Sequence, residues 1–169
     1  IARNTLEKYL RSGKIEDVPP QDEYLNKSLG AFVTLTKNGQ LRGCIGEFDP
    51  IKPLYKVIQD TVISSATKDK RFPTVVFEEL DDIKIEISVM TPKKKVAKWN
   101  DIKLGDDGVV IQRGTKGGTF LPQVANKTGW NLEEFLGRCS RDKAGIGWDG
   151  WKDADIFIYE GTVIEEEEK

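Results

Sequence analysis

An arginine and a cysteine lie two positions apart in the stretch LRGCIG, residues 41–46. A nearby cation such as Arg42 favours the thiolate of Cys44, which is the nucleophilic form of the side chain. Burial against apolar neighbours raises the pKa of a thiol instead. The stretch therefore has two interpretations, a reactive thiol beside a cation or a small residue packed in a strand. Spacing alone favours the second.

The composition restricts the chemistry further. The chain has 169 residues and contains no histidine. Catalysis by Ser-His-Asp or Cys-His groups and zinc sites that contain histidine are therefore excluded, and two cysteines cannot form a four-thiolate zinc site. We expect no metal site and no cofactor in this chain, so any catalysis must use cysteine, lysine, arginine, tyrosine or carboxylates.

Charge and hydropathy point to an ordinary cytoplasmic protein. The 26 basic and 28 acidic side chains nearly balance, which gives no indication of a nucleic-acid or membrane partner. No apolar run approaches the roughly 18 residues that a membrane-spanning helix needs. The two cysteines, Cys44 and Cys139, do not form a disulfide framework and are expected to be reduced.

The elements that position Arg42 and Cys44 are predicted to be the two strands of a β-hairpin. Asn38 and Gly39 accept positive φ at both central positions of a two-residue turn. Counting outward from this turn pairs four residues whose side chains share one face of the sheet, because side chains alternate between faces. These residues are Val33, Leu35, Arg42 and Cys44.

Arg42 and Cys44 are therefore expected to share a partly sheltered notch, where a guanidinium needs an anion. Asp69 is a candidate for that anion or for a general base, although residues 69–71 could equally form a solvated helix end. Glycines in a strand allow close approach of a ligand. The predicted catalytic residues are Cys44, Arg42 and Asp69, and the predicted ligand-binding residues nearby are Gly43, Gly46 and Arg71.

Helices and hairpin-type strands are mixed without a regular βαβ order, which predicts an α+β fold with an antiparallel sheet and flanking helices. Residues 83–89 alternate strictly between apolar and polar, as a half-buried strand does. Asn131 and Glu134 have the spacing of a capping box at the start of a helix. Residues 108–122 predict a short strand followed by a glycine-rich loop, and Pro122 argues against a helix directly after it.

The stretch LRGCIG is identical to the signature of the AMMECR domain family, and the chain is identified as a member on this resemblance. Four further segments resemble the family in the same order. They are ATKDKRFPTV, IKIEISVMTP, GTFLPQVA and KAGI, the last followed by a tryptophan. The resemblance extends from about Leu6 to Tyr159.

The resemblance implies two unequal lobes around a cleft, with the signature motif near that cleft. We expect a single AMMECR domain over residues 1–169, in which the acidic run at 165–169 forms a solvated tail. Phe120 and Gln123, within the matched FLPQV segment, are expected to line the cleft as ligand-binding residues. The family has no settled activity. Its prokaryotic domain is similar to one found beside, or fused to, a Memo-type dioxygenase relative and a radical-SAM protein.

Three functional hypotheses follow. The leading one is an enzyme or enzyme partner in which Cys44 is the nucleophile or acceptor, Arg42 stabilises an anion and Asp69 handles protons. The alternative is a binding module whose Arg42 notch captures a carboxylate, a phosphate or a peptide terminus. The third is a docking surface for a Memo-type or radical-SAM partner. The ligand is expected to be an unknown small molecule or peptide.

Overall fold

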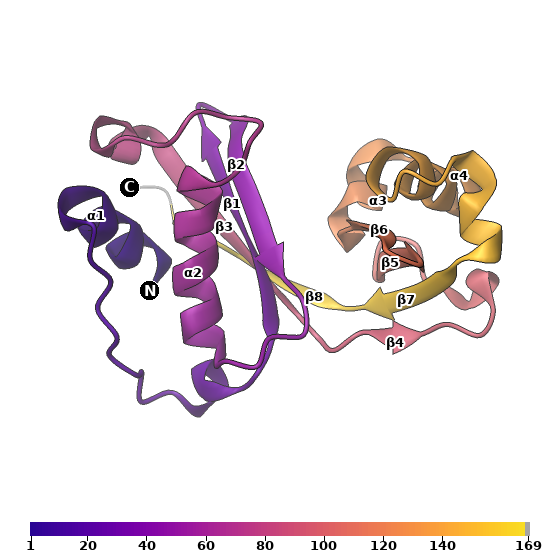
Figure 1. Cartoon of the computed structure of the whole chain (residues 1–169), viewed down its shortest axis with the longest axis horizontal. Coiled ribbons are helices and arrows are strands. Elements are labelled where there is room, and N and C mark those ends of the chain that lie inside the picture. Colours follow the sequence, from indigo (N-terminus) through magenta and orange to yellow (C-terminus); the bar gives the residue numbers. More distant parts are fainter. Residues whose placement is uncertain (168–169) are drawn as a thin grey trace. The chain divides into compact units, whose positions relative to one another are not determined.

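The computed structural model describes residues 1–167, and the chain forms two compact units (Figure 1). Unit 1 consists of Ile1–Met90 together with the described residues from Thr162 onward, and unit 2 consists of Thr91–Gly161. Each unit has its own four-stranded sheet and its own apolar core. The predicted α+β fold is confirmed.

Unit 1 places two helices on one face of its sheet, in which the strand order is β2-β1-β3-β8 (Figure 1). β1 pairs antiparallel with both β2 and β3. The elements of this unit are α1 (Ala2–Ser12), η1 (Glu23–Asn26), β1 (Gly30–Lys37), β2 (Gln40–Glu47), α2 (Leu54–Thr67), η2 (Phe77–Asp82), β3 (Ile83–Met90) and β8 (Gly161–Glu165).

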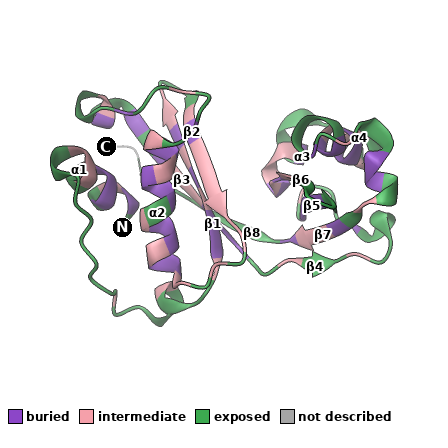
Figure 2. Cartoon of the chain, in the orientation of Figure 1, coloured by how far each residue is buried: buried purple, intermediate pink, exposed green. Residues whose placement is uncertain are grey.

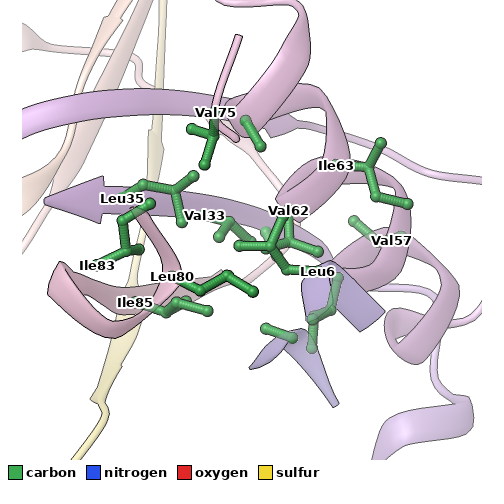
Figure 3. Packing of buried hydrophobic residues seen from close by; sticks show 14 of the residues in the cluster. Leu6, Val33, Leu35, Val57, Val62, Ile63, Val75, Leu80, Ile83 and Ile85 are labelled. Atoms are coloured by element: carbon green, nitrogen blue, oxygen red, sulfur yellow. The ribbon is translucent and has the colours of Figure 1, made fainter. Parts of the chain in front are cut away.

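The core of unit 1 forms where α2 packs on β1 and β2, and apolar side chains of β3 belong to the same buried cluster (Figures 2 and 3). Val33 and Leu35 of β1 are fully buried there against Val62 of α2. The alternation predicted for residues 83–89 is confirmed on the apolar face, where Ile83, Ile85 and Val89 are buried and Ile87 is partly buried in the same cluster. The predicted open face is not exposed throughout, because Ser88 is also buried. Burying several aliphatic side chains of this size stabilises the unit by about 1.5–3 kcal/mol each.

The β1–β2 hairpin has the predicted turn but not the predicted register. Asn38 and Gly39 both have positive φ, at 52° and 75°. Thr36 faces Leu41 as expected, but the register then shifts, so that Leu35 faces Gly43. One extra residue on one strand is a β-bulge, and here that residue is Arg42.

Beyond the bulge, every β2 residue lies on the sheet face opposite to the predicted one. Thr34 faces Cys44 and Val33 faces Ile45, so the predicted pairs Val33 with Cys44 and Leu35 with Arg42 are wrong. Cys44 lies on the face opposite the buried α2 side. The physical reason is Gly43, which faces α2 so closely that a Cβ would lie 2.1 Å from the carbonyl oxygen of Ser65.

Unit 2 contains a sheet of order β4-β7-β5-β6. Its core includes the fully buried Ile111, Phe135, Leu136 and Cys139. Its elements are β4 (Lys94–Lys95), η3 (Trp99–Asp101), β5 (Gly108–Arg113), β6 (Lys116–Phe120), α3 (Pro122–Thr128), α4 (Leu132–Arg138), η4 (Cys139–Lys143), η5 (Trp148–Asp153) and β7 (Asp155–Tyr159).

Three sequence-based predictions for unit 2 can be compared with the structure. Asn131 and Glu134 form the predicted capping box at the start of α4. The glycine-rich loop is instead strand β6, in which Gly118 lets the backbone of Ala144 approach to within 2.4 Å of where a Cβ would lie. Pro122 begins α3 rather than preventing it, because proline is tolerated in the first turn of a helix.

The C-terminal end of the described chain is held by one arginine. Glu165 belongs to β8, and the carboxylate of Glu166 binds the guanidinium of Arg3. Arg3 also donates to the carbonyl oxygens of Leu80 and Ile83, at 2.8 and 2.6 Å. The predicted acidic tail therefore contributes two residues to unit 1, whereas residues 168–169 lie outside the described part.

The close contact at Gly43 predicts the effect of one added methyl group. Gly43→Ala is expected to destabilise unit 1 by at least about 2 kcal/mol, because the Ser65 carbonyl is backbone and cannot rotate away. Urea unfolding followed by circular dichroism measures this. Gly117→Ala is the matched control, since the nearest atom there is 3.4 Å away, and it is expected to change stability by less than about 0.5 kcal/mol. Equal effects of the two substitutions would contradict the contact.

Candidate functional site

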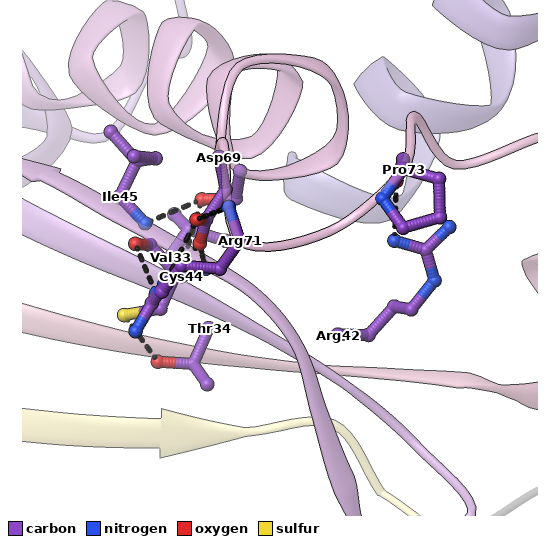
Figure 4. Close-up of polar contacts among 9 residues, drawn as sticks. Val33, Thr34, Arg42, Cys44, Ile45, Asp69, Arg71 and Pro73 are labelled. Carbon is purple, nitrogen blue, oxygen red and sulfur yellow. Dashed lines mark hydrogen bonds and ion pairs between the residues drawn. The ribbon is translucent and has the colours of Figure 1, made fainter.

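Arg42 is bound within unit 1 and does not lie beside the thiol (Figure 4). Its Nε and Nη2 donate to the two carboxylate oxygens of Glu79 at 3.1 and 2.8 Å, and its Nη1 donates to the carbonyl oxygen of Pro73 at 2.7 Å. The side chain is only 11% exposed. The anion that pairs with Arg42 is therefore Glu79, and the prediction that Asp69 pairs with it is wrong.

Asp69 pairs instead with Arg71, two residues along the same loop (Figure 4). Arg71 donates through Nε to Oδ1 at 2.9 Å and through Nη2 to Oδ2 at 2.7 Å. These bonds, together with the backbone N–H of Cys44, hold the pKa of Asp69 well below its usual range despite its burial. Asp69 is thus ionised at neutral pH and a weak proton acceptor.

The Asp69–Arg71 pair also covers the outer edge of the sheet. β2 is an edge strand, and its Cys44 N–H donates to Oδ2 of Asp69 at 2.9 Å. Nη2 of Arg71 lies 3.4 Å from the Cys44 carbonyl oxygen. The two side chains therefore take the place of a neighbouring strand at this residue, which protects the edge from pairing with another chain.

The thiol of Cys44 is half-buried on the sheet face opposite α2. Its Sγ lies 3.3 Å from Oγ1 of Thr34. Burial raises the pKa of Cys44, and this effect exceeds the opposing contributions of the Thr34 contact and the Arg71 charge, while Asp69 and Glu86 raise it further. Cys44 is therefore a neutral thiol at pH 7, not an activated thiolate.

Ser65 of α2 is a site residue that the sequence did not reveal. Its hydroxyl accepts from the N–H of Ile45 at 2.9 Å and donates to the carbonyl oxygen of Val33 at 2.7 Å. Because Val33 and Ile45 face each other across the hairpin, the hydroxyl is inserted between the two strands. This contact ties the end of α2 to the motif, and no spacing in the sequence signals it.

The remaining predicted ligand-binding residues have structural surroundings of their own. A Cβ at Gly46 would overlap the ring of Phe32 at 2.3 Å, so this glycine, like Gly43, is required by packing. Phe120 and Gln123 belong to unit 2, where Phe120 is buried with its ring centroid 5.3 Å from that of Phe135. The ligand roles predicted for these residues stay predictions.

The described residues offer no assembled metal site. No three cysteine, aspartate or glutamate side chains within residues 1–167 gather closely enough to hold an ion. Both cysteines are free, and burial raises the pKa of Cys139 to about 12. None of the helices in this part of the chain combines the length and the apolar character needed to cross a bilayer.

Comparison with known proteins identifies the family. The AMMECR1 family profile matches residues 1–164. The chain belongs to the AMMECR1 family. It is 43% identical to Protein MK0488 of Methanopyrus kandleri over 99% of this chain and 86% of that protein. It is 39% identical to Protein NEQ441 of Nanoarchaeum equitans over 99% of this chain and 97% of that protein.

A solved structure supports the fold of this AMMECR1-family chain. The crystal structure of uncharacterized protein PH0010 from Pyrococcus horikoshii is similar with a TM-score of 0.92 and 37% sequence identity. The match covers 98% of this chain and 88% of that chain. The family assignment made from the LRGCIG stretch is therefore confirmed, and it carries no assigned reaction with it.

In this AMMECR1-family chain the LRGCIG stretch joins β2 to the end of α2 and to the loop after it. Arg42 binds that loop at Pro73, and Gly43 and Ile45 contact Ser65. Cys44 is held there through its backbone by Asp69. Most of the motif is thus explained by local packing and hydrogen bonds, and the Cys44 side chain and Arg71 remain as the groups available for function.

The Arg42–Glu79 pair predicts a pH-dependent contribution to stability. The hydrogen bonds from Arg42, with smaller contributions from the Val76 N–H and Lys37 and against the effect of burial, lower the pKa of Glu79 from 4.5 to about 2. Its stabilising effect is therefore complete above pH 4.5 and is lost as the pH falls toward 2. Glu79→Gln is expected to reduce the free energy of unfolding by about 1–3 kcal/mol at pH 7, with the difference from the parent chain vanishing at low pH.

Urea unfolding at a series of pH values measures this difference. Glu78→Gln is the matched control, because Glu78 is the exposed neighbour and its loss leaves the Arg42 pair intact. A Glu79→Gln difference that persists unchanged to pH 2 would show that the charge of Glu79 is not what stabilises the loop.

The surroundings of Cys44 predict slow alkylation. Because burial raises the pKa of Cys44, its alkylation rate at pH 7 is expected to be below that of an unhindered cysteine. Arg71→Gln should raise the pKa further, since the Arg71 charge lowers it. Rates measured against pH in a Cys139→Ser background test both statements. An apparent pKa well below about 8.5 would contradict them.

Proposed function

We propose that this AMMECR1-family chain acts as a non-catalytic binding module that captures an anionic group at Arg71, beside Cys44. The observation that carries the proposal is the difference between the two arginines. The Arg42 guanidinium is bound by Glu79 and Pro73 and is almost buried. The Arg71 side chain is 51% exposed, and its Nη1 has no hydrogen-bond partner among residues 1–167.

The guanidinium of Arg71 is held in one orientation before any ligand arrives. Asp69 binds it through two hydrogen bonds, and its CZ atom lies 5.4 Å from the ring centroid of Phe72. Because Nη2 already donates to Asp69 and to the Cys44 carbonyl oxygen, Nη1 is the group that can donate charge-assisted hydrogen bonds to a carboxylate or phosphate. Fixing the arginine in advance reduces the entropy lost on binding. Asp69 offsets part of the positive charge, so the expected affinity is modest.

The protonation states favour binding over catalysis. A nucleophilic cysteine needs a lowered pKa and a general base needs a pKa near the working pH. The pKa of Cys44 is raised by burial, and that of Asp69 is held low by Arg71. Neither group is therefore tuned for the thiol chemistry that the sequence first indicated.

The anionic group has two sources that share the same chemistry. It is either a free small molecule or a carboxylate carried by a partner protein, for which the Memo-type and radical-SAM proteins associated with the family are candidates. Binding of small anions tests the site at Arg71 itself. A partner protein that binds while small anions do not would have to contact a larger surface of the chain.

A titration tests the proposed anion site. Acetate and inorganic phosphate are added to the ¹⁵N-labelled chain at constant ionic strength, and backbone amide shifts are recorded. Shifts are expected at Cys44 and Arg71 because their N–H groups both bind Asp69, the partner of the guanidinium. Arg71→Gln should abolish them and Arg71→Lys should weaken them, while Cys44→Ser should leave them unchanged.

Arg113→Gln is the matched control, because Arg113 is an exposed arginine in unit 2. An equal loss of binding in Arg113→Gln and Arg71→Gln would contradict the proposal. Loss of binding in Cys44→Ser, or a turnover that depends on the Cys44 thiol, would favour the enzyme hypothesis instead. Circular dichroism of each variant verifies that it is folded.

A further inference from the structure

Unit 2 contains a cavity of about 320 Å³, which lies within the lower range of small-molecule sites. All of its lining residues lie between residues 95 and 156, so the cavity belongs to this unit alone. The aromatic and charged side chains of its wall are Lys95, Trp99, Glu133, Trp151, Lys152 and Asp155. None of them is used by the site around Arg71.

Two indole rings form part of the cavity wall. Trp99 and Trp151 meet edge to face, with ring centroids 5.3 Å apart and planes at 70°. Trp151 is buried, whereas Trp99 is 38% exposed. Trp99 therefore lines the cavity while it is partly exposed, and an indole ring is the strongest aromatic partner for a cation.

Among the charged side chains that line the cavity, one carboxylate has no ion-pair partner in the described part of the chain. Lys95 pairs with Asp155 at 2.7 Å, and Lys152 pairs with Asp149 at 2.7 Å. Glu133 has no hydrogen-bond or ion-pair partner within the described part of the chain. Each lysine therefore already has a carboxylate partner. Glu133 is near enough to Lys152 to help raise the pKa of that ammonium group, and its own carboxylate oxygens, which accept no hydrogen bond from the described residues, favour a cationic ligand.

The chain itself supplies one example of a cation against these rings. The ammonium nitrogen of Lys152 lies 5.6 Å from the ring centroid of Trp151 while it also binds Asp149. This arrangement combines an indole face with a carboxylate around one ammonium group. Trp99 and Glu133 offer the same two components, and no ammonium group of the described residues lies over the Trp99 ring.

We propose that this cavity binds an organic cation, an alkylammonium group on a short apolar stem. The ammonium head would contact the Trp99 ring and the Glu133 carboxylate, and the stem would pack against Val96 and Ile156, which also line the cavity. Such a head occurs both in free amines and in the lysine side chain of a peptide. The proposal is independent of the anion site in unit 1.

The four tryptophan side-chain N–H resonances of the ¹⁵N-labelled full chain provide the readout. n-Butylammonium is the probe, and butyrate at the same ionic strength is the matched anion of equal apolar length. Butylammonium is expected to shift the Trp99 and Trp151 resonances more than those of Trp130 and Trp148. Butyrate is expected to cause no comparable shift.

Substitutions separate the contribution of the Trp99 ring from that of the Glu133 carboxylate. Glu133→Gln is expected to weaken butylammonium binding about threefold to tenfold, and Trp99→Ala by a similar factor, while Trp99→Phe should retain part of the affinity. Glu160→Gln, an exposed glutamate of unit 2 that does not line the cavity, should have no effect. Equal effects of Glu133→Gln and Glu160→Gln would overturn the proposal.

Tighter binding of butyrate than of butylammonium, or saturating amine without any shift at Trp99, would also overturn it. A second probe, Nα-acetyl-lysine amide, carries the ammonium group on a lysine side chain and distinguishes a peptide ligand from a free amine. Tighter binding than butylammonium would support a peptide ligand, and weaker binding would support a free amine. Both of these results require the cavity to bind an ammonium group and therefore support the proposal.

Discussion

The β-bulge at Arg42 is the constraint on which the rest of unit 1 depends. It adds one residue to β2 and so directs Arg42 and Gly43 toward α2 and its following loop, while Cys44 turns to the opposite face. Gly43 then lets the Ser65 carbonyl approach the strand, and Arg42 reaches Glu79. Without the bulge Arg42 and Cys44 would share a face, and the site would be the cationic thiol notch that the residue types first indicate.

The two arginines of the site have different physical roles because their exposure differs. The Arg42 guanidinium forms three hydrogen bonds within unit 1 and is nearly buried. Releasing it for a ligand would break all three and leave Lys37 as the remaining cation beside the sheltered Glu79 carboxylate. The Arg71 guanidinium is oriented by Asp69 yet half exposed. Binding an anion at Arg71 breaks no existing contact, whereas binding one at Arg42 does.

The sequence predicted what local interactions determine. The turn at Asn38–Gly39, the alternation in β3 and the capping box at Asn131 each depend on residues within a few positions, and each is confirmed. The bulge was missed because it is decided by contact with Ser65, and Glu79 was missed because it lies 37 positions from Arg42. Pairing by simple counting therefore fails at Arg42, two residues before Cys44.

The guanidinium resonances of Arg42 and Arg71 test this division of roles most directly. Their Nε–H signals can be followed by NMR while inorganic phosphate is added to the folded chain at constant ionic strength. We expect the Arg71 signal to shift and saturate while the Arg42 signal stays where Glu79 holds it. A saturating shift at Arg42 with Arg71 unmoved would contradict the account, because it would make the buried pair the anion site.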